Sequence, residues 1–181
     1  MIVVLTEEQS MRVALRTLFE AQWPKRIHGV DWHIISFQGK ADLKDRMADK
    51  MRAWNYGDPH FVILRDNDGA DCRALKEKIR VDAEKGNKPH HIRIVCQELE
   101  SWFIGDLEAV AAAYPNRSVR AGASKYRKPD RLNNTSQELA GIVGERGKVG
   151  RAERIAQHMQ PERNRSVSFR VAFQTFAELL S

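Results

Sequence analysis

The chain has 181 residues, 42% hydrophobic and 30% charged, with a net charge of +6, which excludes a disordered chain and suits a globular domain. Its longest apolar runs, residues 1–5 and 61–64, are too short to span a bilayer, and residues 1–10 lack the pattern of a signal peptide. Two isolated cysteines, Cys72 and Cys96, exclude a disulfide framework, so the expected location is the cytoplasm.

Strand-like and helix-like segments alternate over the first 100 residues or so. Short apolar runs predict four strands, at residues 3–5, 32–37, 60–64 and 92–96. Between these runs, apolar residues recur at helical spacing and predict helices. Leu43, Met47 and Met51, for example, recur every four residues on one helix face. This order predicts an α/β fold with a mainly parallel four-stranded sheet flanked by helices.

The pattern changes after Glu98. Short helices are expected at residues 99–103, 107–114, 139–143, 152–159 and 167–180, with a long basic loop at 116–136. No flexible linker precedes the later helices, so they are expected to form a cap on the same core. The expected organisation is a single domain, with an α/β core at 1–115 and a basic loop and helical extension at 116–181.

Acidic residues follow three of the four predicted strands. Glu7 and Glu8 follow the first strand, Asp66 and Asp68 the third, and Glu98 and Glu100 the fourth. Ligands of open parallel sheets bind beyond the carboxyl ends of the strands, where these side chains would converge. Carboxylates so close together repel one another unless a cation lies between them. The pattern therefore predicts a site for Mg²⁺ or Mn²⁺, a cation that takes carboxylates, water and substrate phosphate.

Asp66 and Asp68 are the best candidates, because alternate residues leaving a strand share one side and can face one ion. Helix capping is the alternative for several of these acids. Asp68 is also placed to cap the helix that follows, and Thr6 could cap the first helix with Glu7 beside its dipole. Of the acids after the fourth strand, Glu100 is favoured for the site, and Asp106 is expected to cap a helix.

The basic residues are concentrated in the last third of the chain. Residues 1–114 contain 17 Lys and Arg against 18 Asp and Glu, whereas residues 115–181 contain 13 against 6. Nucleic acid is therefore the expected partner, although a soluble arginine-rich face that binds nothing has the same composition. The candidates for phosphate contacts are Lys125, Arg127, Lys128 and Lys148.

Several other kinds of site are excluded by sequence. The six histidines have no zinc-ligand spacing, and no GxGxxG, GxxxxGK[ST] or GxSxG motif is present. A phosphotransfer or nucleotide-binding enzyme of the doubly wound class is a weaker hypothesis, because the phosphate loops are missing.

A glutamate after the first strand and a D-x-D after the third resemble the TOPRIM domain of topoisomerases, primases and OLD-family nucleases. More narrowly, the chain is similar to a family of uncharacterised bacterial TOPRIM-like proteins over nearly its whole length. The matching stretches are Val62–Asp68 with Cys72 and Lys76, Gln97–Phe103 with Asp106, Lys128–Asp130, and Asn164–Phe169. The TOPRIM glutamate is usually followed by Gly, but here Glu8 follows Glu7, which leaves both as candidates with Glu7 favoured.

The resemblance implies a TOPRIM-like fold and a Mg²⁺-dependent site that acts on phosphodiesters, with Glu7, Asp66 and Asp68 as the metal ligands. It also implies a component of phage-defence or nuclease systems, often encoded beside an ATPase. The first hypothesis is a metal-dependent nuclease in which Glu100 is a second ligand or a base. The second is a non-catalytic subunit that binds an ATPase or nucleic acid, with acids that only cap helices.

Overall fold

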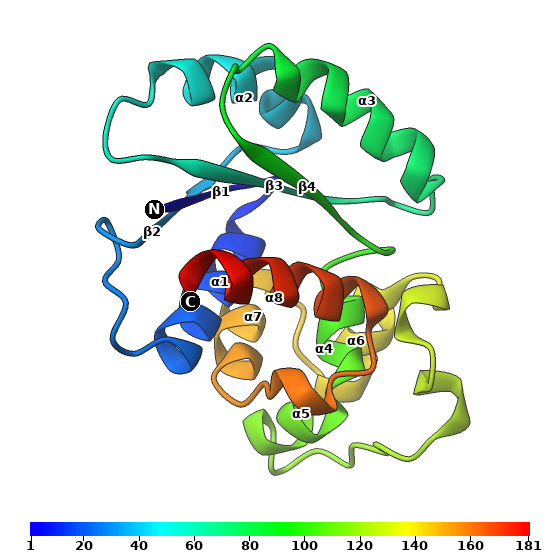
Figure 1. Ribbon diagram of the computed structural model, residues 1–181. Helices are drawn as coiled ribbons and strands as arrows, with labels where there is room; N and C mark the ends of the chain where they lie inside the picture. The colour runs from blue at the N-terminus through cyan, green and yellow to red at the C-terminus, as the bar shows by residue number, and fades with distance from the viewer.

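A computed structural model describes all 181 residues and contains one parallel sheet of four strands in the order β2-β1-β3-β4 (Figure 1). The strands are β1 (Ile2–Thr6), β2 (Trp32–Ser36), β3 (His60–Asp66) and β4 (His90–Val95). The predicted α/β fold with a four-stranded parallel sheet is therefore confirmed. No helix has both the length and the apolar composition that a bilayer crossing requires.

Helices cover both faces of the sheet. One face carries α2 (Lys40–Ala53) and α3 (Cys72–Glu84), and the other carries α1 (Gln9–Gln22) and α8 (Val167–Leu180) (Figure 1). A further layer of short helices completes the second side: α4 (Glu100–Gly105), α5 (Leu107–Ala113), α6 (Thr135–Val143) and α7 (Lys148–Ala156). Single 3₁₀ turns lie between them, at η1 (Ser124–Tyr126), η2 (Pro129–Arg131) and η3 (Pro161–Arg163).

Alternation along the strands divides the interior into two cores. Val62 and Leu64 point towards α1 and the short helices, into a cluster of 31 buried hydrophobic residues. Phe61 and Ile63 point towards α2 and α3, into a cluster of 12. Because successive side chains of a strand lie on opposite faces, an apolar run without polar interruptions is what a strand covered on both sides requires.

Some predicted boundaries are wrong at the level of a few residues. The expected loop at 116–136 overlaps the start of α6, and it contains the turns η1 and η2. The helix expected at 152–159 is α7, which begins four residues earlier at Lys148. Its first turn contains Lys148 and the buried Arg151. Because these residues are charged, the spacing of apolar residues does not indicate the first turn of the helix.

The connections diverge at the carboxyl ends of β1 and β3. The chain leaves β1 towards α1 on one face, whereas it leaves β3 towards α3 on the opposite face. The two strands are hydrogen-bonded neighbours, so the outgoing segments diverge from adjacent strand ends. Such a point of divergence is where open α/β sheets bind their ligands.

Helix α8 is attached to this edge by Asp130 in η2. One oxygen of Asp130 accepts from the Ser166 hydroxyl at 2.6 Å, and the other accepts from the Ser168 backbone N–H at 2.8 Å. The Ser168 hydroxyl in turn accepts from the indole N–H of Trp102 and from the backbone N–H of Cys96. The Lys128–Asp130 and Asn164–Phe169 stretches therefore join the start of α8 to the end of β4.

We expect Asp130→Ala to lower the free energy of unfolding by about 2–3 kcal/mol, because it leaves buried donors at the start of α8 without their charged acceptor. Chemical denaturation measures this loss. Asp45→Ala removes an exposed carboxylate that forms no ion pair, and it should cost almost nothing. Equal stability of the two variants would contradict this role of Asp130.

Candidate functional site

Four of the acids that the sequence singles out lie at the carboxyl edge of the sheet. Glu7 directly follows β1, Asp66 is the last residue of β3, and Asp68 lies in the turn after it. Glu100 is the first residue of α4, in the segment that leaves β4. The parallel order of the strands thus brings together carboxylates from three separate parts of the chain.

Asp66 lies at the centre of this group. It is 7% exposed, and its Oδ1 atom is buried without a hydrogen-bond partner. Burial raises the pKa of the Asp66 carboxyl well above its usual range, and the nearby carboxylates of Glu7 and Glu8 raise it further. An isolated charge in such a position is costly, because neither water nor a hydrogen bond compensates it.

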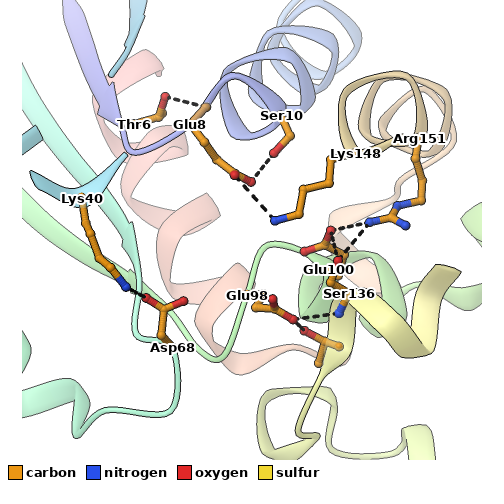
Figure 2. Close-up of polar contacts among 11 residues, drawn as sticks. Thr6, Glu8, Ser10, Lys40, Asp68, Glu98, Glu100, Ser136, Lys148 and Arg151 are labelled. Carbon is orange, nitrogen blue, oxygen red and sulfur yellow. Dashed lines mark hydrogen bonds and ion pairs between the residues drawn. The ribbon is translucent and has the colours of Figure 1, made fainter. Parts of the chain in front are cut away.

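Glu7 and Asp68 lie towards the α2 side, and each contacts a basic residue. Arg65 Nε is 3.7 Å from Glu7 Oε2. Lys40 Nζ is 2.8 Å from Asp68 Oδ2 (Figure 2). Burial raises the pKa of Glu7, and the Asp68 carboxylate adds to the rise, while Arg65 and Lys40 oppose it. Asp68 has a positive φ of 49°, so the backbone there does not continue the extended conformation of β3.

Glu100 lies on the opposite side of the edge and is held by the helical layer. Its Oε1 atom accepts from Arg151 Nη2 of α7 at 2.5 Å and from the Ser136 hydroxyl of α6 at 3.1 Å (Figure 2). The Glu100 and Arg151 side chains are only 3% and 1% exposed, so this is a fully buried ion pair. Its other oxygen, Oε2, has no partner.

Lys148, a predicted phosphate ligand, also lies among these acids. Its Nζ atom is 3.6 Å from Glu8 Oε2 and points between Glu8 and Glu100 (Figure 2). Burial alone would lower the pKa of the Lys148 ammonium, but the carboxylates of Glu100 and Glu8 outweigh burial and raise it. The acidic group therefore has basic side chains from both layers around it.

The hydrogen bonds show which of these residues cap helices. Asp71, not Asp68, caps α3 by accepting from the Ala74 N–H at 2.8 Å. Thr6 does not cap α1, whose first turn has no side-chain cap. Glu98 accepts from the Ser136 N–H and binds the start of α6, whereas Asp106 caps α5 as expected. Asp66 and Asp68 thus have no helix-capping role.

The donor set suits a hard divalent cation. No group of three or more His, Cys, Asp or Glu side chains is already arranged to hold a metal ion, because Asp68 and Glu100 face basic residues. However, Glu7 Oε2 and Asp66 Oδ1 are buried acceptors without hydrogen bonds. Mg²⁺ requires only one or two protein carboxylates beside water and phosphate, so these residues fit it.

The other predicted phosphate ligands lie apart from the acids. Lys125 is paired with Glu138 at 2.5 Å. Arg127 and Lys128 line a cavity of about 410 Å³ whose other basic residues are Arg131, Arg165 and Arg170. None of these five basic residues is in an ion pair, so we name this cavity the basic groove (Arg127, Lys128, Arg131, Arg165 and Arg170).

Sequence reasoning missed the basic partners of the acids. Arg65 is adjacent to the D-x-D and shares the face of Ile63, so strand alternation could have placed it near Glu7. Lys40 and Arg151 reach the site from helices distant in sequence, and no local pattern indicates them.

Residues 6–180 match the family model described as a domain of unknown function, DUF4276, and the chain belongs to this family. A search of curated proteins finds no match. Among solved structures, the chain is similar to the C-terminal region of the Burkholderia pseudomallei OLD protein. The TM-score is 0.56 at 14% identity, and the match covers 99% of this chain and 98% of that one. The fold is thus TOPRIM-like and related to that of the OLD protein.

We expect Asp66→Asn to stabilise the folded chain at pH 7, by about 1–2 kcal/mol, because it removes a carboxyl group whose ionisation is opposed by burial. The raised pKa of Asp66 means that the folded state holds its proton to higher pH than the unfolded state. Wild-type stability therefore falls as pH rises above the ordinary carboxyl pKa, up to the folded pKa.

The gain in unfolding free energy from Asp66→Asn should accordingly be largest at pH values above the pKa of Asp66 in the folded state. It should shrink as the solution is acidified. Denaturation without divalent cations at several pH values measures it, with the exposed Asp45→Asn as the control. A variant less stable than wild type at pH 7, with no pH dependence of the difference, would refute the electrostatic account.

Proposed function

We propose that this protein is a Mg²⁺- or Mn²⁺-dependent nuclease that cleaves phosphodiester bonds. One observation carries the proposal: Glu7 and Asp66, from the ends of adjacent parallel strands, present buried carboxylate oxygens without hydrogen-bond partners at the point where the chain diverges. Such groups are expensive to maintain unless they serve a ligand. The TOPRIM-like fold related to the OLD protein supports this class of activity.

Glu7, Asp66 and Asp68 would hold the cation, with Glu100 as a further ligand or a base. When bound, the metal polarises the phosphate and lowers the pKa of an attacking water. The protein contributes a buried position for Asp66 and carboxylates fixed by the strand ends. A cation would also lower the carboxyl pKa of Glu7 and Asp66, and so remove the cost of their ionisation.

The basic residues would bind the substrate backbone. Lys40 and Lys148 are paired with Asp68 and Glu8, and a cation at the acids would release them to contact phosphate. The basic groove carries five positive charges with no acidic partner and would hold the strand beyond the cleavage point. Phosphate contacts of this kind fix position on nucleic acid without reading its sequence.

A second candidate is a non-catalytic subunit of an ATPase or a nucleic-acid-binding module. The ion pairs of Asp68 with Lys40 and of Glu100 with Arg151 favour it, since they neutralise two of the acids without a metal. The solved structure that matches is one region of a larger protein, which suits a chain that acts with a partner. A role in phage defence beside an ATPase agrees with either candidate.

We expect the wild-type protein to nick supercoiled plasmid or degrade single-stranded DNA or RNA with Mg²⁺ or Mn²⁺, and Asp66→Ala/Asp68→Ala to lose at least about 100-fold in rate. Gel assays with and without EDTA measure the cleavage.

The matched control is Asp45→Ala/Glu153→Ala, which removes two exposed acids that form no ion pair and should leave cleavage unchanged. Equal cleavage by the Asp66/Asp68 variant and wild type would eliminate the nuclease proposal. Absence of cleavage by every form, with nucleic acid still bound, would favour the non-catalytic candidate.

A further inference from the structure

A second cavity lies on the opposite side of the acidic edge from the helical layer. It occupies about 370 Å³ between α2 and α3, which lie side by side over the sheet in Figure 1. Lys40 and Lys44 of α2, Arg65 of β3 and Lys78 of α3 line it, above an apolar floor. We name it the α2–α3 groove.

Two of the four basic residues of this groove lack counterions in the chain, whereas Lys40 is paired with Asp68 and Arg65 lies 3.7 Å from Glu7. Lys44 and Lys78 form no ion pair with any residue of the chain. Arg65 makes no hydrogen bond, and its Nε atom is buried without a partner. Asp82 is the only acid in the lining, and its Oδ1 atom is paired with Lys85 Nζ at 2.6 Å. The groove thus presents basic donors for an anion that the protein itself does not supply.

Arg65 is the most informative of these residues. Its side chain is only 19% exposed, yet its only ion-pair partner is Glu7 at 3.7 Å, beyond hydrogen-bond distance. A guanidinium has five donors in a planar fork that matches phosphate oxygens. A guanidinium that makes no hydrogen bond within the chain, and whose Nε atom is buried, is costly, so it indicates a ligand rather than a structural role.

The apolar floor of the groove indicates a ligand that has an apolar part in addition to a phosphate. Leu43, Met47 and Ile79 lie beneath the groove and are almost fully buried, and Val81, which is 53% exposed, adds accessible apolar surface. An apolar surface beside several cations suits a molecule that carries both an aromatic ring and a phosphate. A nucleotide has this combination, and the volume is in the range that binds small ligands.

We propose that the α2–α3 groove binds a nucleoside 5′-phosphate, with the phosphate on Lys44, Arg65 and Lys78 and the base over the apolar floor. The ligand is either a free nucleotide or the phosphorylated end of a nucleic acid strand. The groove is separate from the cation site, although Arg65 also neighbours Glu7. Its occupancy requires no metal, so it can be tested independently of cleavage.

Calorimetry with the full chain in EDTA tests the proposal, with deoxyadenosine 5′-monophosphate as the probe. We expect wild type to bind it, and Lys44→Ala/Lys78→Ala to bind about tenfold more weakly or worse, because two charged contacts are lost. The matched control, Lys50→Ala/Lys76→Ala, removes the same charge from the same helices outside the groove and should bind as wild type does.

Inorganic phosphate and deoxyadenosine should each bind more weakly than the complete nucleotide. Competition by a short 5′-phosphorylated oligonucleotide, but not by its 5′-hydroxyl form, would identify a strand end as the ligand, and no competition would identify the free nucleotide. Equal binding by the groove and control variants, or no binding to wild type at millimolar nucleotide, would overturn the proposal. Loss of cleavage in Asp66→Ala/Asp68→Ala should leave this binding intact.

Discussion

Repulsion between carboxylates at the carboxyl edge of the sheet is the constraint around which this protein is organised. Glu7 and Asp66 come from the ends of neighbouring parallel strands, and burial raises the pKa of both, with a further rise from Asp68 at Glu7 and from Glu7 at Asp66. Basic residues from each layer surround the edge and offset part of this repulsion: Lys40, Arg65, Lys148 and Arg151. Without these basic residues, only a bound cation could offset the repulsion between the acids.

The fold positions the acids of the sheet and of the helical layer without a dedicated metal-binding loop. The sheet brings Asp66 beside Glu7 because β1 and β3 are paired, and α3 and α1 then depart on opposite faces. The helical layer adds Glu100, held by Arg151, and closes over the edge through α6 and α7. The carboxylates therefore have neighbours of two kinds, a sheet that fixes them and helices that limit access of water.

Much of the sheet could be predicted from the sequence, because a short apolar run such as residues 61–64, preceded by a turn at residues 55–59, is typical of a strand buried on both faces. The convergence of Glu7 with Asp66 also followed, since parallel strands end at one edge. The basic partners could not be predicted, because Lys40 and Arg151 reach the edge through packing of distant helices. Glu8 and Glu98 looked equivalent to the site acids by position, and only tertiary contacts assign Glu98 to the start of α6.

The central claim is that this edge accepts a divalent cation. The most direct measurement is the melting temperature of wild-type protein and of Asp66→Asn as Mn²⁺ is titrated. The account predicts that Mn²⁺ raises the melting temperature of wild type in a saturable way and has no effect on the variant. A wild-type melting temperature indifferent to Mn²⁺, or an equal rise in both proteins, would contradict it.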